Sequence, residues 1–159
     1  MTALIIYDSI FGNTEKVAQA MAAALPALAV LVSQVTTDRL RGVDLLIVGS
    51  PTRSFRPTPA TSKLLKSLSK DQLAGVQVAA FDTRIWLPTI DSAALRFLVD
   101  KGGYAANTMA QALKKKGGTL AAPPEGFLVT GEQGPLKDGE LERAAAWTRQ
   151  LVRAVMPVR

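Results

Sequence analysis

The fold is decided by one short polar stretch, Ser9-Ile10-Phe11-Gly12-Asn13-Thr14, and by what flanks it. An apolar, β-branched run precedes it at Ala3–Tyr7 and predicts a buried strand. Apolar residues then recur at helical spacing as far as Pro26, which predicts a helix over 14–25. A strand, a turn containing one glycine and a helix place backbone N–H groups at a helix N-terminus, where phosphate groups bind readily.

The composition of the turn narrows its ligand. It contains no lysine and lacks the Gly-x-x-x-x-Gly-Lys spacing, which argues against a nucleoside triphosphate with Mg²⁺. It also lacks the Gly-x-Gly-x-x-Gly fingerprint of dinucleotide sites. The side chains of Ser9, Asn13 and Thr14, with the backbone amides, suit a single terminal phosphate. The same residues would also suit an ordinary turn in which Asn13 and Thr14 cap the helix.

Length and composition indicate one globular domain spanning residues 1–159, with 48% hydrophobic and 20% charged residues. No apolar run is long enough to cross a bilayer, so we expect a cytoplasmic protein with no membrane span. The chain has no cysteine and no histidine. Thiolate, zinc, haem and iron–sulfur chemistry are therefore not expected, and redox chemistry would need a bound organic cofactor.

The net charge of +6 favours anionic partners in general. Its basic runs are Lys63, Lys66 and Lys70, and the triplet Lys114-Lys115-Lys116. Both lie on or just after predicted helices whose other faces are apolar, so they are expected to be solvated faces. No aromatic residues interleave with them, and we expect no nucleic-acid partner.

Strand and helix patterns alternate along the chain, which predicts an α/β fold with a parallel sheet between two helical layers. The expected strands are Ala3–Tyr7, 29–35, 45–49, 76–81 and a last one split between 119–121 and 126–130. The expected helices are 14–25, 59–68, 104–116 and 138–155, with a further short helix at 91–100. A ligand should bind at the carboxyl edge of this sheet, where the loops after the first, third and fourth strands meet.

Several of these segments resemble the flavodoxin family. Residues 5–14 are similar to the FMN phosphate loop of flavodoxins, with Phe11 where many members have threonine. Further similar segments are Gly49-Ser50-Pro51-Thr52, Phe81-Asp82-Thr83-Arg84, Pro123-Pro124-Glu125-Gly126-Phe127 and Gly134-Pro135-Leu136. The resemblance implies a flavodoxin-like three-layer sandwich with a five-stranded parallel sheet in the order 2-1-3-4-5, and FMN as the cofactor.

Three loops would then hold the FMN. The candidate cofactor-binding residues are Ser9, Ile10, Phe11, Gly12, Asn13, Thr14, Pro51, Thr52, Arg53, Ser54, Phe55, Asp82, Thr83, Arg84, Ile85 and Trp86. Asp82 would either cap its loop or accept a bond from the cofactor, and Trp86 would either contact the flavin or fold back on its own loop. Trp147 is expected to be a packing residue. No catalytic residue and no metal ligand is predicted.

Three functions remain open from the sequence. The first is an FMN-binding electron carrier working with a redox partner protein or a small electron acceptor. The second is a small FMN-dependent oxidoreductase of the quinone reductase type, with its substrate beneath residues 91–101. The third is a flavodoxin-like module that has lost FMN. The 91–101 segment would alternatively join a homodimer contact.

A basic rim is the last expectation. Arg53, Arg56 and Arg84 lie in the predicted flavin loops, with only Asp82 as a nearby acid in the sequence. Positive charge near a flavin should favour its reduced, anionic form.

Overall fold

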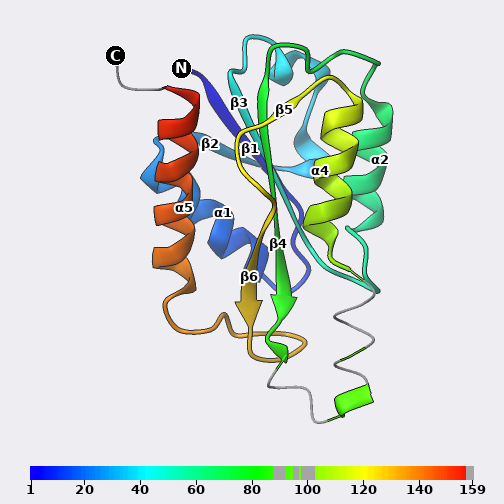
Figure 1. The fold of residues 1–159 in the computed structure, drawn as a ribbon, viewed down its shortest axis with the longest axis vertical. Coiled ribbons are helices and arrows are strands. Elements are labelled where there is room, and N and C mark those ends of the chain that lie inside the picture. The colour runs from blue at the N-terminus through cyan, green and yellow to red at the C-terminus, as the bar shows by residue number, and fades with distance from the viewer. Residues whose placement is uncertain (88–91, 95–96, 98–102, 157–159) are drawn as a thin grey trace.

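A single parallel sheet forms the centre of the molecule (Figure 1). The computed structural model describes residues 1–87, 92–94, 97 and 103–156. The strands within them are β1 (Ala3–Tyr7), β2 (Leu28–Leu31), β3 (Leu45–Pro51), β4 (Gln77–Ile85), β5 (Thr119–Leu120) and β6 (Glu125–Val129). Their order is β2-β1-β3-β4-β5, which confirms the predicted order 2-1-3-4-5.

The last strand is interrupted, as the sequence indicated. β5 pairs with the start of β4 and β6 pairs with its end, so the two pieces follow one another along the same edge. Pro123 and Pro124 lie between them. Because proline has no N–H to donate to the ladder, the pairing stops there and resumes at Glu125.

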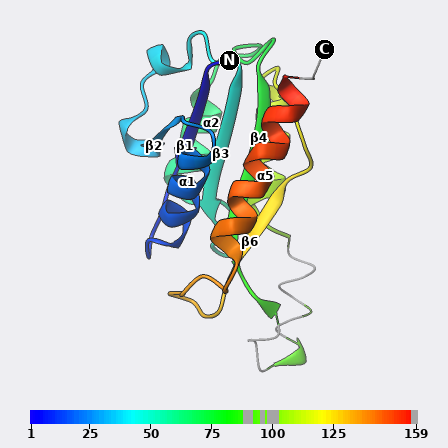
Figure 2. The same cartoon turned by 90° about the vertical axis from the view of Figure 1, so that its left-hand side faces the viewer.

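Helices cover both faces of the sheet and complete the predicted three layers. Figure 2 shows α1 (Asn13–Ala24) and α5 (Glu140–Val155) side by side on one face. The other face carries α2 (Pro59–Ser67) and α4 (Ala105–Lys115). Across the described part of the chain, no helix combines the length and the apolar character needed to span a membrane.

The segments that follow β2 and β4 contain further helical residues. Short 3₁₀ helices, Val32–Gln34 and Thr37–Leu40, connect β2 to β3. The helix expected at 91–100 lies largely outside the described residues, although Ala93, Ala94 and Phe97 are helical.

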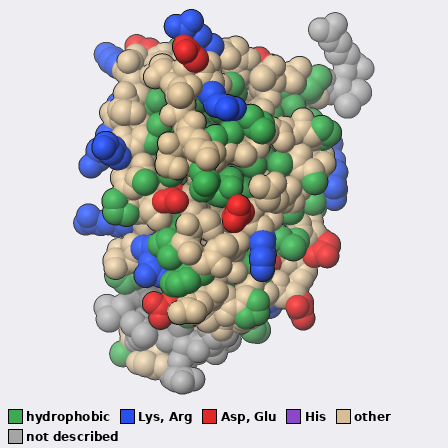
Figure 3. Space-filling model, turned by 180° about the vertical axis from the view of Figure 1, so that it is seen from behind, with side chains coloured by type: hydrophobic (Ala, Val, Ile, Leu, Met, Phe, Trp, Pro, Cys, Tyr) green, Lys and Arg blue, Asp and Glu red, His purple; other side chains and the backbone are tan. Residues whose placement is uncertain are grey.

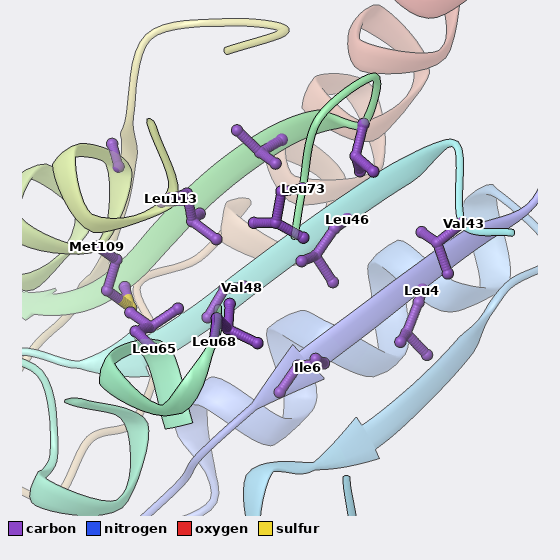
Figure 4. Packing of buried hydrophobic residues seen from close by; sticks show 14 of the residues in the cluster. Leu4, Ile6, Val43, Leu46, Val48, Leu65, Leu68, Leu73, Met109 and Leu113 are labelled. Atoms are coloured by element: carbon purple, nitrogen blue, oxygen red, sulfur yellow. The ribbon is translucent and has the colours of Figure 1, made fainter. Parts of the chain in front are cut away.

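The alternation of side chains along each strand divides the core in two. Leu4 and Ile6 of β1 point toward the α2/α4 layer, where Leu46, Leu65 and Met109 pack with them (Figure 4). Residues between them point to the α1/α5 layer. Both faces are apolar because both are covered, which is typical of strands in parallel sheets.

An aromatic cluster fills the α1/α5 side. Phe81, Phe127 and Trp147 meet edge to face, with ring centroids 6.0–6.5 Å apart. This confirms the packing role predicted for Trp147. Gly49 of β3 makes room for the cluster, because a Cβ there would lie 2.0 Å from the Phe81 ring.

Three strand ends differ from the sequence expectation by two residues or more. β3 continues to Pro51, two residues past its expected end at Gly49. β2 ends at Leu31, not at 35, because the chain turns into a 3₁₀ helix at Val32. β4 continues to Ile85, four residues past its expected end at Phe81. β6 pairs with all four extra residues, and the end of β3 pairs with Asp82 and Thr83. Residues 82–85 are therefore strand residues, and not part of a loop.

Charged side chains occupy the surface without gathering into one patch on the face seen in Figure 3, where Lys and Arg are dispersed and Asp and Glu lie between them.

An ion-pair network joins β6 to α5. The buried Glu140 carboxylate accepts bonds from the Leu128 N–H at 2.7 Å and from Arg143 Nε and Nη2 at 2.9 and 2.7 Å. Burial alone would raise the pKa of Glu140, but the bonds from Arg143 and Leu128 outweigh it and leave the pKa lowered. Arg143 also contacts Glu125 at 3.0 Å.

We predict that Glu140→Gln lowers the free energy of unfolding by about 1–3 kcal/mol at neutral pH, because Arg143 loses a charged acceptor. The folded pKa lies below its ordinary value of 4.5, so this stabilisation is present above that value and is lost as the pH falls through the folded one. Urea unfolding of both proteins at neutral and at acid pH measures the difference. Glu142→Gln, an exposed neighbour in the same turn, should change stability by less than about 0.5 kcal/mol. A Glu140→Gln loss that is equally large in acid would contradict the ion-pair explanation.

Candidate functional site

A cavity of about 270 Å³ opens at the carboxyl ends of β1, β3 and β4. This volume is near the lower end of the range for small-molecule sites. The strands end there at the lower edge of the view in Figure 1. The predicted residues that line it are Ser9, Ile10, Phe11, Asn13, Thr14, Pro51, Thr52, Arg53, Ser54, Phe55, Thr83, Arg84 and Ile85. Segments from all three predicted loops thus meet at one cavity.

The turn between β1 and α1 presents unused donors to this cavity. Gly12 adopts a left-handed conformation (φ 91°) just before the helix, and the chain can turn there because glycine has no Cβ. The N–H groups of Ile10, Phe11, Asn13 and Thr14 bond to no other described residue. They lie at the positive end of the α1 dipole, so the turn is suited to an anion.

Hydroxyl groups add donors of a second kind. Ser9 Oγ accepts bonds from the Gly12 N–H at 3.1 Å and the Glu15 N–H at 3.3 Å, so its own proton remains for a ligand. The buried hydroxyls of Thr14 and Thr83 lie 2.8 Å apart. Because that pair shares one hydrogen bond, one of its two protons is also available.

Side-chain bonds anchor the turn at three places, on β4, on the loop after β6 and on the start of α2. The Thr14–Thr83 bond ties it to β4, and Asn13 Nδ2 donates to the Gln133 carbonyl at 3.1 Å, beyond β6. The Asp8 carboxylate accepts from the Ser9 N–H at 2.9 Å and from the Thr58 hydroxyl at 2.5 Å. Thr58 is the N-cap of α2. Asp8 was not among the predicted site residues, although its position directly before the turn was a signal for such a role.

Apolar side chains surround the mouth of the cavity. Ile10, Phe11 and Phe55 line it and are 50%, 42% and 38% exposed. The Arg53 guanidinium lies 5.5 Å from the centre of the Phe11 ring and 4.0 Å from the Glu132 carboxylate. The cavity therefore combines an anion-binding end with flat apolar walls.

Phe55 lies in a strained turn. Arg53 and Arg56 exchange backbone hydrogen bonds at 2.8 and 2.9 Å, so Ser54 and Phe55 form a two-residue hairpin turn. Both have positive φ, 48° and 69°, which is uncommon for residues with side chains. Backbone strain of this kind often marks functional positions.

Asp82 lies behind the cavity wall and does not line the cavity. Its carboxylate is fully buried and accepts bonds from Arg84 Nε and Nη2 at 2.7 and 2.8 Å and from the Ala106 N–H at 2.9 Å. Asp82 therefore caps the start of α4, a role that differs from both of its predicted ones, the cap of its own loop and a contact to the cofactor. Burial raises the pKa of Asp82, although the bonds from Arg84 and Ala106 act in the opposite direction.

The ion pairs change the expectation of a basic rim. Arg84 is neutralised by Asp82, and Glu132 lies close to Arg53, so the rim is more nearly neutral than the sequence suggested. The sequence argument missed both pairs, because Asp82 and Arg84 are strand residues on one face and Glu132 arrives from the loop after β6.

The other predicted residues outside the cavity wall are Gly12 and Trp86. Gly12 shapes the turn. The backbone N–H of Trp86 donates to the Val129 carbonyl at 2.8 Å, and Lys137 Nζ lies 4.9 Å from the centre of the Trp86 ring.

Sequence reasoning overlooked a fourth segment of the wall. Tyr104, Val129, Gly131 and Glu132 also line the cavity. Val129 ends β6, and Gly131 and Glu132 lie in the loop after it. Because β6 pairs with β4 in parallel, the carboxyl end of β6 reaches the same edge of the sheet. The sequence did predict a split last strand, and the loop after that strand was the available signal for these wall residues. Among the described residues, no group of three or more acidic side chains is placed to hold a metal ion.

Comparison with known proteins places this geometry in a family context. A family model described as "Flavodoxin domain" matches residues 4–125. In structure, the chain is similar to a flavodoxin from the domain Archaea, with 21% identity, a TM-score of 0.73, and coverage of 98% of this chain and 99% of that one. It is also similar to Flavodoxin 2 from Bacillus cereus, with 18% identity, a TM-score of 0.74 and coverage of 96% and 99%. No curated protein matches the sequence. At these identities the structural likeness establishes the fold alone.

We predict that Phe55→Gly is more stable than Phe55→Ala by about 1 kcal/mol, because both remove the ring and only alanine keeps a Cβ at positive φ. Thermal or urea unfolding of the two variants measures the difference. Phe11 is the matched control, an exposed phenylalanine of the same cavity without positive φ. There the order should reverse, with Phe11→Ala more stable than Phe11→Gly. The same order at both positions would show that residue 55 carries no backbone strain.

Proposed function

The chain belongs to the flavodoxin domain family, and on that premise we propose that it is an electron-transfer flavoprotein that binds FMN in the cavity at the carboxyl edge of its sheet. Family membership implies a flavin cofactor. The choice of FMN is supported by one observation above the others, the set of N–H groups and hydroxyl protons at the turn of residues 9–14 that bond to no described residue.

The donors fit a terminal phosphate. Backbone N–H groups at a helix N-terminus, Ser9 Oγ and the Thr14–Thr83 hydroxyl pair would surround a dianion from several directions. Phe11 contributes its N–H, not a hydroxyl. No lysine or arginine of the turn contributes, so helix dipole and hydrogen bonds would carry the binding.

The walls fit a flat ring. Residues 51–55 and 83–85 would flank it from the ends of β3 and β4, and Tyr104 adds an aromatic side chain. When bound, FMN supplies the electron-accepting chemistry, which the side chains of this chain do not provide. The role of the protein is to bind the cofactor, orient it and exclude water from part of its surface.

A carrier fits the site better than a reductase. A reductase of the quinone type would need a proton donor at the cavity, and the described wall offers only Glu132, an exposed carboxyl near Arg53, and the Tyr104 phenol, whose ring stacks on Arg84. We propose a redox partner protein that approaches the apolar mouth formed by Ile10, Phe11 and Phe55. Function as one domain of residues 1–159, a cytoplasmic location and a homodimer contact stay predictions from the sequence.

Cofactor choice provides the main test. Titration of the apoprotein should give tighter binding for FMN than for riboflavin, by about 10-fold or more, since riboflavin lacks the phosphate. FAD should bind more weakly than FMN, because the turn suits a terminal phosphate. Quenching of flavin fluorescence measures all three affinities. Equal affinity for FMN and riboflavin would show that the turn binds no phosphate, and absence of binding to any flavin would refute the proposed function.

The Thr14 hydroxyl provides a second, more local test. Thr14→Val keeps the shape of the side chain and removes the hydroxyl of the pair that belongs to the turn, leaving only that of Thr83 on β4, so it should weaken FMN binding by about 10- to 100-fold. Riboflavin binding should change much less. Thr148→Val is the matched control, because Thr148 is also a buried helical threonine, bonded to the Ala144 carbonyl at 2.8 Å and remote from the cavity wall. Equal losses for FMN and riboflavin would indicate a packing role for Thr14.

A further inference from the structure

The carboxyl end of β4 holds an arginine and an aspartate as one unit. The Asp82 side chain is fully buried, and its two oxygens accept bonds from Arg84 Nε and Nη2 at 2.7 and 2.8 Å. The Ala106 N–H donates to the same carboxylate at 2.9 Å. Because two residues on one face of a strand form the pair, it needs no movement of a loop to assemble.

Arg84 is fixed on its flat faces as well. The centre of its guanidinium lies 3.6 Å from the Tyr104 ring centre. Gly126 lies against the same side chain, since a Cβ at that position would be 2.1 Å from Arg84 Nε. The side chain is 20% exposed and lines the cavity. Arg84 therefore cannot turn away from the cavity without breaking the pair with Asp82.

The pair has an electrostatic consequence for any ligand in the cavity. An arginine in a partly buried wall would act as a full positive charge that water screens poorly. A bidentate carboxylate buried directly behind it cancels most of that charge. Arg53, by contrast, is 41% exposed and lies 4.0 Å from Glu132, so water and salt screen its charge.

We propose that Asp82 is a positioning residue that sets the reduction potential of the bound flavin, by acting as the buried counter-ion of Arg84. The inference rests on the proposed function, since it places a flavin in the cavity. While the Asp82 carboxylate is present, the cofactor contacts a wall of Tyr104 and Arg84 that carries no net charge. Without the Asp82 charge, the same wall would be cationic and would favour the reduced, anionic flavin.

A role as helix cap alone gives a different expectation. The side-chain oxygen of an asparagine at position 82 can still accept from the Ala106 N–H. A residue that only caps α4 can therefore be replaced by asparagine with some loss of stability and no change of potential. The potential thus separates the two roles.

The experiment uses FMN-loaded protein titrated anaerobically with dithionite, which supplies the electrons, in the presence of a reference dye. Asp82→Asn should shift the equilibrium for uptake of the last electron about tenfold toward the reduced flavin, which is about 59 mV for one electron. The double variant Asp82→Asn/Arg84→Met removes both charges and should return within about threefold of the unmodified protein. Both results should persist at high salt, because the pair is buried.

Each other outcome overturns the inference. An unchanged reduction potential of the flavin in Asp82→Asn would show that Asp82 only caps α4. If Asp82→Asn does not fold, the double variant provides the test. A tenfold fall in its equilibrium constant for uptake of the last electron, relative to the unmodified protein, would show that Arg84 is an uncompensated cation in the unmodified protein. Arg53→Gln serves as the comparison, with an effect that should shrink as salt is added.

One measurement needs no cofactor and separates this inference from the proposed function. In the apoprotein, the Arg84 Nε–H should give a slowly exchanging NMR signal that disappears in Asp82→Asn. Its absence from the unmodified apoprotein would overturn the counter-ion role even if FMN binds. Its presence in a protein that binds no flavin would support the ion pair and refute the proposed function alone.

Discussion

The common direction of the strands is the constraint on which the site depends. All the pairings in the described sheet are parallel, so every strand delivers its carboxyl end to the same edge. Right-handed crossovers return the chain through the two helical layers and leave that edge open. Segments separated by more than a hundred residues, such as Asn13 and Gln133, come into contact there. Strands and helices together supply the core, and the sheet direction brings the polar groups together.

Local signals in the sequence predicted one half of the site well. The strand, turn and helix around Gly12 depend on neighbouring residues, and the structure agrees with them to within a residue. The end of β4 was harder, because pairing with β3 and β6 extends it and no local pattern reports such pairing. Once that strand is extended to Ile85, the spacing of Asp82 and Arg84 places both on one face. Tyr104 depends on the path of the chain between β4 and α4, which a sequence pattern does not determine.

Overall charge is a poor guide to the charge of this site. The chain carries a net +6, yet acidic partners accompany the arginines at the cavity. Asp8 adds a further carboxylate beside the turn that binds an anion by our proposal. Its two bonds orient the Ser9 N–H and the Thr58 hydroxyl, so it acts on the shape of the turn. Several of the basic residues that produce the excess lie on exposed helix faces, such as Lys63, Lys66 and Lys114.

The three anchors of the turn, to β4, to α2 and to the loop after β6, also bear on the entropy of binding. A loop that orders only around its ligand loses conformational freedom at that moment, and the loss is subtracted from the affinity. Here the freedom is already lost when the chain folds, since every anchor lies within the protein. The apoprotein is therefore expected to keep its binding turn assembled, and cofactor entry becomes a docking step with little accompanying folding.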